Sequence, residues 1–179
     1  MAKTHSSSET PLRLRAVAQE DVAFLSSCLQ DAIAPIVDMT YEAADRRFVM
    51  VVNRFKWEAG AVDPAGDDAF GTDEDDELPE GASAYWRTNC GLRIHGVSAV
   101  RHRGIDLNDR GAILNLLAVQ AEPSTIMLDF SGGACLALTV ERLDILLEDL
   151  GEPWLTFRQP DHAETDSPSE EPAQADAEQ

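Results

Sequence analysis

The chain has 179 residues and a formal net charge of -19 at pH 7, from 33 acidic residues against 14 lysines and arginines. This length allows one domain with a substantial core, and no apolar run is long enough to span a bilayer. The acidic balance argues against non-specific binding to nucleic acid, because the phosphate backbone would be repelled.

The acidic excess lies in two segments. Residues 58–80 hold ten acidic residues and no basic one, and residues 161–179 hold seven more, again with no basic one. The rest of the chain is nearly neutral, with 16 acids against 14 basic residues. We predict a single α+β domain over 12–160. Because acidic segments of this kind bury too little apolar surface to fold, we predict that 59–83 is a disordered insertion within this domain. The two tails, 1–11 and the acidic 161–179, are also predicted to be disordered.

The first ten residues are polar and lack the apolar centre of a secretory signal, so we expect a cytoplasmic protein. The cysteines are odd in number, far apart and in no metal-type spacing, and we expect buried, reduced thiols. They are Cys28, Cys90 and Cys135.

The first predicted element is an amphipathic helix over residues 19–33, which Pro35 ends. Its apolar stripe consists of Val22, Leu25, Leu29 and Ile33. Residues 36–41 can form a strand, 42–45 a turn, and 47–57 a longer strand. The longer strand is apolar on both faces, which predicts a strand covered on both sides or one at the corner of a rolled sheet.

Residues 85–105 are predicted to be extended, with a bulge at Gly96 that would bring two apolar pairs onto one face. These pairs are Leu92 with Ile94 and Val97 with Ala99. The apolar run at 112–121 is too short for its period to separate a helix from a buried strand. The short polar connection that follows it favours a strand.

A hairpin is predicted over residues 125–140, where apolar and polar residues alternate on either side of Ser131-Gly132-Gly133. A two-residue loop would set the two apolar rows on opposite faces. A three-residue loop with a left-handed glycine puts them on one face, so we prefer it. That register pairs Leu128 with Leu136 and Ile126 with Leu138.

A C-terminal helix is predicted to follow the hairpin, because four leucines recur at helical spacing. They are Leu143, Leu146, Leu147 and Leu150. Gly151 stands where a helix C-terminus is expected, and Pro153 would prevent continuation. Residues 154–157 could pack as a last extended segment.

These elements predict an α+β fold in which a strongly bent antiparallel sheet, or a partly open barrel, carries an N-terminal and a C-terminal helix. A pleckstrin-homology-like roll has that strand count and C-terminal helix, although the analogy carries no function.

Several segments resemble an alphaproteobacterial family described only as a domain of unknown function, DUF2948. They are Leu29-Gln30-Asp31-Ala32, Asp45-Arg46-Arg47-Phe48, Asn53-Arg54-Phe55-Lys56-Trp57-Glu58, Ala99-Val100-Arg101-His102-Arg103-Gly104-Ile105 and Asp149-Leu150-Gly151-Glu152-Pro153-Trp154. The resemblance runs from about Leu12 to His162. It implies a small bacterial cytoplasmic protein and supplies no activity, ligand or catalytic residue.

A basic stretch is the main candidate site. Its residues are Arg87, Arg93, His95, Arg101, His102, Arg103 and Arg110. If the bulge at Gly96 forms, several guanidinium groups share one sheet face and could bind carboxylate or phosphate. The alternative is an ordinary solvated strand face. We also hypothesise that the acidic residues 73–77 transiently cover this surface.

Other chemistry has little support in the sequence. His95 and His102 would lie roughly 20 Å apart on an extended strand, and no zinc-type spacing or phosphate-binding glycine loop is present. We therefore expect no metal and no cofactor, and we assign no catalytic residue.

Two functions stay open. The first is a non-enzymatic binding or scaffold module that recognises a protein or small anionic ligand by an edge strand or the arginine face, without nucleic acid or membrane as partner. The second is a small enzyme or ligand-binding protein whose site forms only in the fold, with His95 or His102 as base and Asp129 or Asp31 to orient it. The oligomeric state cannot be predicted.

Overall fold

The computed structural model describes residues 11–62 and 84–157. It contains one α-helix, α1 (Gln19–Leu29), and three short 3-10 turns at Ile36–Asp38, Trp57–Ala59 and Ser131–Gly133. The strands are β1 (Arg13–Ala16), β2 (Ala32–Pro35), β3 (Met39–Glu42), β4 (Arg47–Phe55), β5 (Ala61–Val62), β6 (Ala84–His95), β7 (Val97–Arg103), β8 (Ile113–Glu122), β9 (Thr125–Phe130), β10 (Cys135–Val140) and β11 (Ile145–Thr156).

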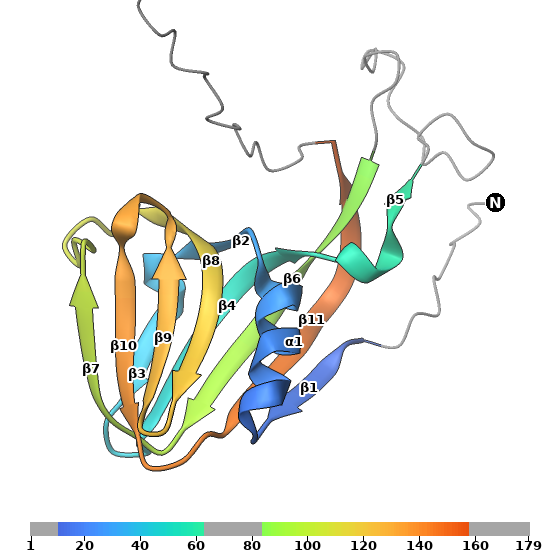
Figure 1. Cartoon of the computed structure of the whole chain (residues 1–179). Coiled ribbons are helices and arrows are strands. Elements are labelled where there is room, and N and C mark those ends of the chain that lie inside the picture. The colour runs from blue at the N-terminus through green and yellow to red at the C-terminus, as the bar shows by residue number, and fades with distance from the viewer. Residues whose placement is uncertain (1–10, 63–83, 158–179) are drawn as a thin grey trace, which may run out of the picture.

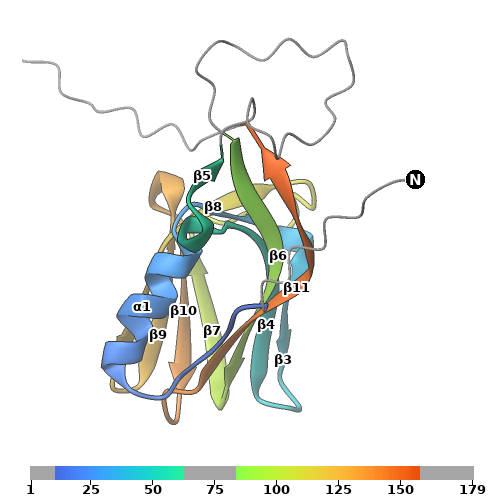
Figure 2. The same cartoon turned by 90° about the vertical axis from the view of Figure 1, so that its right-hand side faces the viewer.

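All eleven strands of the described residues belong to one antiparallel sheet, in the order β1-β11-β6-β4-β2-β8-β9-β10-β7, with β3 added to β4 and β5 to β6. The sheet curves so that β1, β11, β6 and β4 form one wall and β8, β9, β10 and β7 face them as the other (Figure 1). Helix α1 packs against β8 and β1 and covers the space between the walls on that side (Figures 1 and 2). The predicted antiparallel sheet is thus confirmed, and α1 lies within the range predicted for the first helix.

The core lies between the two walls, where alternate residues of each strand point inward. Fully buried side chains come from the first wall, from the second wall and from α1. They include Met50, Leu92, Ile94 and Leu147, then Leu116, Ile126, Leu128 and Leu138, and then Leu25 and Leu29. Each such side chain contributes about 1.5–3 kcal/mol relative to an exposed position.

The hairpin of β9 and β10 has the predicted register. Leu136 lies opposite Leu128 and Leu138 lies opposite Ile126, and all four side chains are buried. Gly132 and Gly133 both have φ above 70° in the connection, which is the left-handed conformation that glycine adopts without strain. Burial of one face and the turn chemistry together specify this pairing.

The predicted C-terminal helix is wrong. Residues 145–156 form β11, which pairs with β1 on one edge and β6 on the other. Ile145 and Leu147 are buried, whereas Leu150 is 43% exposed. The segment therefore has a period of two, and the leucine spacing of a helix was coincidental. The likeness to a pleckstrin-homology roll depended on that helix and loses its basis.

Three boundaries also differ from the predictions. Helix α1 ends at Leu29, because Asp31 takes a positive φ of 60° and turns the chain into β2. The segment predicted as a strand at 36–41 begins with a 3-10 turn before β3. At Gly96, with φ of 70°, the chain passes from β6 in one wall to β7 in the other, rather than continuing as one bulged strand.

Residues 1–10 of the predicted N-terminal tail, residues 63–83 of the predicted insertion and the acidic C-terminal tail lie outside the described residues. The same holds for residues 73–77 and their hypothesised contact with the basic stretch. The insertion was predicted to be disordered from residue 59, but Ala59 ends a 3-10 turn and Ala61–Val62 form β5, which pairs with β6. In the part of the chain that is described, no helix has the length and apolar character needed to cross a membrane.

Candidate binding site

The turn at Gly96 distributes the predicted basic residues over four environments, so they do not share one face. Arg87 is buried near the start of β6, while Arg93 and His95 lie near its end, in the first wall. Arg101 and Arg103 are exposed on β7, in the second wall. His102 and Arg110 line a cavity beside β7.

Arg87 is a structural residue. It is 8% exposed, its guanidinium carbon lies 4.0 Å from the centre of the Phe55 ring, and Nη2 donates to the carbonyl oxygen of Asn53 at 3.1 Å. Burial lowers the pKa of Arg87 from its usual value. This arginine anchors an aromatic cluster through a cation–π contact and is not presented to a ligand.

Arg93 has neighbours that the sequence interpretation missed. Arg15 and Arg93 flank Leu146 in one cross-strand row, so their Cα atoms lie about 10 Å apart on the outer face of the first wall. Arg15 is held by Asp144 through two hydrogen bonds of 2.9 and 3.1 Å. No strand was predicted at residues 13–16, because a four-residue strand gives too weak a periodic signal.

The edge of β7 is the most distinctive feature of the second wall. Among the described residues β7 pairs only with β10, so its other edge carries no strand. At its first residue this edge touches the β3–β4 hairpin. The N–H of Val97 donates to the carbonyl oxygen of Arg46 at 2.8 Å, and the Tyr41 hydroxyl donates to the carbonyl oxygen of Val97 at 3.2 Å. Beyond Val97, no such backbone contact continues along the edge within the described chain.

A cavity of about 350 Å³ opens between β3 and β7. Its apolar lining reaches the inner face of both walls and includes Met39, Phe48, Val100, Ile105 and Leu136. Among the described residues that line it, the ionisable groups are Tyr41, His102 and Arg110, and none of these is a carboxylate. On β7, Arg101 and Arg103 alternate with the pocket-facing Val100 and His102, so they point to the opposite face of the strand. The face of β7 that lines the cavity therefore combines the apolar Val100 with His102, and the opposite face carries Arg101 and Arg103.

The structure places Asp31 and the two histidines considered as catalytic bases at three different cavities, with Asp31 at one, His95 at a second and His102 at a third. The Asp129 carboxylate accepts from the Gln120 amide at 2.8 Å, and the Asp144 carboxylate near His95 is occupied by Arg15. No group of three or more His, Cys, Asp or Glu side chains suited to a metal is present in the described ranges.

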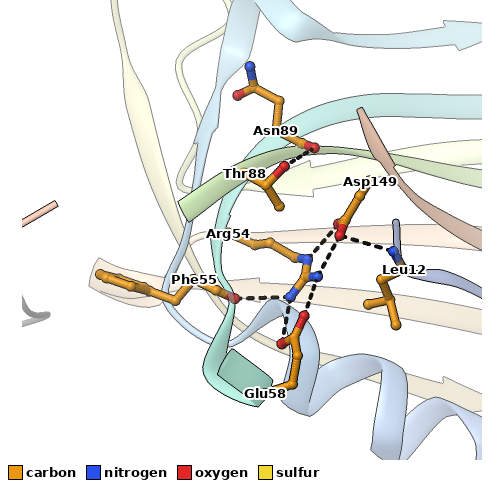
Figure 3. A network of polar contacts seen from close by, with 7 residues as sticks. All are labelled: Leu12, Arg54, Phe55, Glu58, Thr88, Asn89 and Asp149. Carbon is orange, nitrogen blue, oxygen red and sulfur yellow. Dashed lines mark hydrogen bonds and ion pairs between the residues drawn. The ribbon is translucent and has the colours of Figure 1, made fainter. Parts of the chain in front are cut away.

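The most extensive polar network was not predicted and surrounds Arg54 (Figure 3). This side chain is 0% exposed. Nε and Nη2 donate to the two oxygens of Asp149 at 2.8 and 2.9 Å, and Nη1 and Nη2 donate to the two oxygens of Glu58 at 3.1 and 2.7 Å. Nη1 also donates to the carbonyl oxygen of Phe55 at 3.0 Å, so all five N–H groups are used.

The network joins distant parts of the chain. The Asp149 carboxylate also accepts from the N–H of Leu12 at 3.2 Å, which ties β11 to the segment before β1. Burial alone would lower the pKa of Arg54, but the bonds and charges of Asp149 and Glu58 outweigh it and raise that pKa. Arg54 therefore stays charged between its two carboxylate partners.

Two cysteines lie close enough to this cluster to interact with its charges. Burial raises the pKa of Cys28, and it raises the pKa of Cys90 to about 12. Both thiols are therefore protonated near neutral pH and poorly suited to act as nucleophiles. All three cysteines are buried and none forms a disulfide, as predicted for buried, reduced thiols.

The comparisons with known proteins identify a family but no activity. The family model described as "Protein of unknown function (DUF2948)" matches residues 12–162, the range over which the sequence resemblance was noted. No curated protein matches, and no solved structure matches. The alphaproteobacterial origin stays a prediction.

Proposed function

Because this chain belongs to the DUF2948 family, whose description assigns no activity, we propose its function from geometry: it is a non-enzymatic binding module that takes an extended acidic segment of a partner protein along the free edge of β7. The observation that carries the proposal is the combination at one place, within the described residues, of a strand edge without a partner strand, an apolar cavity and a cavity lining without carboxylates.

Backbone pairing would supply the affinity. Alternate residues of β7 direct their N–H and C=O groups toward β10, and the others direct theirs to the open edge. An added strand satisfies these groups, as in other cases of strand addition. β3 runs toward the contact at Val97 and β7 runs away from it, so these two strands have opposite directions. A bound peptide strand that is antiparallel to β7 would therefore run parallel to β3.

Side chains would supply the selectivity. On one face of the guest, residues opposite Arg101 and Arg103 would be acidic, since opposite charges on neighbouring strands stabilise a pair by about 0.2–1 kcal/mol each. On the other face, apolar residues would lie beside Val100 and enter the cavity. The preferred segment thus alternates acidic and apolar residues.

A blocked octapeptide that alternates glutamate and valine tests this proposal by calorimetric titration of the full chain. We expect saturable binding that weakens about tenfold in the variant Arg101→Glu/Arg103→Glu, because two attractive cross-strand pairs become repulsive. Two peptide controls are expected to bind poorly: one with lysine in place of glutamate, and one with alternate backbone amides methylated.

The matched control variant is Arg93→Glu/Arg13→Glu, which makes the same charge change on exposed positions of the first wall. It should change the affinity less than about threefold if only long-range charge is altered. Equal weakening by both double variants, or equal binding of the glutamate and lysine peptides, would refute recognition at β7.

A further inference from the structure

The outer face of the first wall carries a groove of about 320 Å³ that shares no lining residue with the cavity beside β7. Outward-facing apolar residues of β4 and β11 line its centre, around Gly91 of β6; they are Val49, Val51, Leu146 and Leu150. Val51 is 38% exposed and Leu150 is 43% exposed. Water therefore contacts an apolar patch whose burial against another surface would be favourable.

The strand register determines where two charges of this face stand. Leu146 lies opposite Arg93, and Glu148 lies opposite Gly91. Arg93 and Glu148 are thus diagonal neighbours across the pair of β6 and β11, with Cα atoms about 8 Å apart. Leu146 and Gly91 occupy the other diagonal of the same square.

Both of these charges are accessible. The Arg93 side chain is exposed and makes no hydrogen bond or ion pair with any described residue. The Glu148 side chain is 42% exposed, and the ion pair that it makes among the described residues joins it to Arg13 at 3.9 Å, whose side chain is 68% exposed. An ion pair so open to solvent contributes about 0–1 kcal/mol, so it does not prevent a closer contact of Glu148 with another cation.

The other charges of the groove do not select a ligand of one sign. Arg47 already pairs with Glu42 and Asp45. The groove lining as a whole holds two arginines and three carboxylates. Such a mixed pattern fits a partner that carries both signs in matching places.

A second copy of the chain has the matching pattern. A twofold axis in the plane of the face, perpendicular to the line from Arg93 to Glu148, exchanges the two positions, so that each Arg93 meets Glu148 of the other copy. By strand spacing and rise, this axis passes close to Leu146 and Val51, each of which then faces its own counterpart. The same operation sets Leu150 opposite Val49 of the other copy, and the strands of the two copies cross steeply, near the orthogonal class of sheet packing.

We propose that a second copy of this chain binds to the outer face of the first wall, giving a twofold-symmetric dimer in which two Arg93–Glu148 ion pairs flank an apolar centre. The strand spacing and rise give a face of roughly 400–500 Å² per copy, which is smaller than the roughly 800 Å² of a standard stable interface. The dimer is therefore weak, with a dissociation constant on the order of 100 μM. It uses neither β7 nor the cavity beside it, so it does not depend on the proposed peptide binding.

Sedimentation velocity of the full chain, over concentrations from about 5 to 500 μM, brackets that dissociation constant. The net charge of -19 opposes association at long range, so the measurement is made in about 0.15 M salt, where charges are screened beyond about 8 Å. We expect the average sedimentation coefficient to rise from the monomer value toward the dimer value over this range.

Two single variants and their mixture test the geometry. Arg93→Glu and Glu148→Arg should each weaken the dimer about tenfold, because the symmetry turns both ion pairs into contacts between like charges. An equimolar mixture of the two variants should associate about as tightly as the unaltered chain, because every contact between the two different chains again joins opposite charges. The double variant Arg93→Glu/Glu148→Arg should likewise regain the affinity.

Two controls make the same charge changes on exposed positions of the second wall. Arg103→Glu on β7 and Glu122→Arg at the end of β8 should change the association less than about twofold. Val51→Thr keeps the shape of the side chain but loses apolar contact at the axis, and it should weaken the dimer about threefold.

A sedimentation coefficient that does not rise with concentration would overturn the proposal. A mixture of the two single variants that associates no better than either alone would also overturn it. Association that Arg103→Glu abolishes would show pairing through the β7 edge in place of this face, with the same consequence.

Discussion

At the scale of single residues, Arg54 determines how the two ends of the domain are joined. Its guanidinium binds Asp149 of β11 and Glu58 after β4, and Asp149 in turn binds the backbone of Leu12. These groups come from positions up to 137 residues apart in the chain. A buried ion cluster is a weak source of net stability, but removing one member leaves the others uncompensated.

Replacing Arg54 by methionine should therefore lower the free energy of unfolding by about 3–5 kcal/mol, because Asp149 remains buried without its cation. Urea denaturation followed by circular dichroism measures the change. Arg93→Met, at an exposed position, is the control and should alter stability by less than about 0.5 kcal/mol. A small effect at Arg54 would show that the cluster is not needed to hold the ends together.

Asp144 gives a pH-dependent prediction. The hydrogen bonds from Arg15 lower the pKa of Asp144, and burial opposes this effect only in part. A carboxyl whose pKa is lower in the folded state stabilises the fold above its unfolded pKa, near 4, and loses that contribution as pH falls through the folded value.

Acid unfolding should thus begin at higher pH in Arg15→Met than in the unaltered chain, and the difference should vanish when both carry Asp144→Asn. Stability measured between pH 5 and pH 2 tests this. An effect of Arg15→Met on acid unfolding that persists in the Asp144→Asn background would contradict it.

At the scale of elements, β11 decides the architecture. It is paired along both edges, and its inward residues Ile145 and Leu147 are fully buried between the walls. Its outward residues Leu146 and Leu150 border a shallow groove on the outer face. A strand exposes neighbouring leucines unequally, whereas the predicted helix would have placed four leucines on one buried stripe.

Leu147→Ala should cost about 2–5 kcal/mol and Leu150→Ala less than about 1 kcal/mol, since only the first leaves a cavity in the core. Urea midpoints of the two variants measured side by side give the comparison. Similar losses would favour the helical stripe and count against the strand.

At the scale of the whole molecule, local patterns were predictable and long-range pairings were not. The β9–β10 hairpin was predicted to the residue, because its register depends on a short turn and one buried face. The pairing of β11 with β1 and β6 was missed, because its partners are remote in the chain and its leucines fit two periods.

In the candidate site, too, the residues themselves could be predicted from the sequence, but their arrangement in space could not. The basic residues of the second wall were named from the sequence, but their separation from Arg87 and Arg93 depends on the turn at Gly96. Arg54, Glu58 and Asp149 stand in segments that carry the family resemblance. Their pairing was missed, because a motif search does not bring together charges that lie 95 residues apart. The cytoplasmic location and the oligomeric state stay untested.

Amide hydrogen exchange of the full chain, with and without the alternating glutamate–valine peptide, tests the role of the β7 edge most directly. Our account predicts that the N–H groups of β7 that face away from β10 exchange several-fold more slowly in the presence of peptide, while those of β1, the strand at the opposite end of the sheet, are unchanged. Peptide binding that leaves every β7 amide exchanging at its original rate would contradict it.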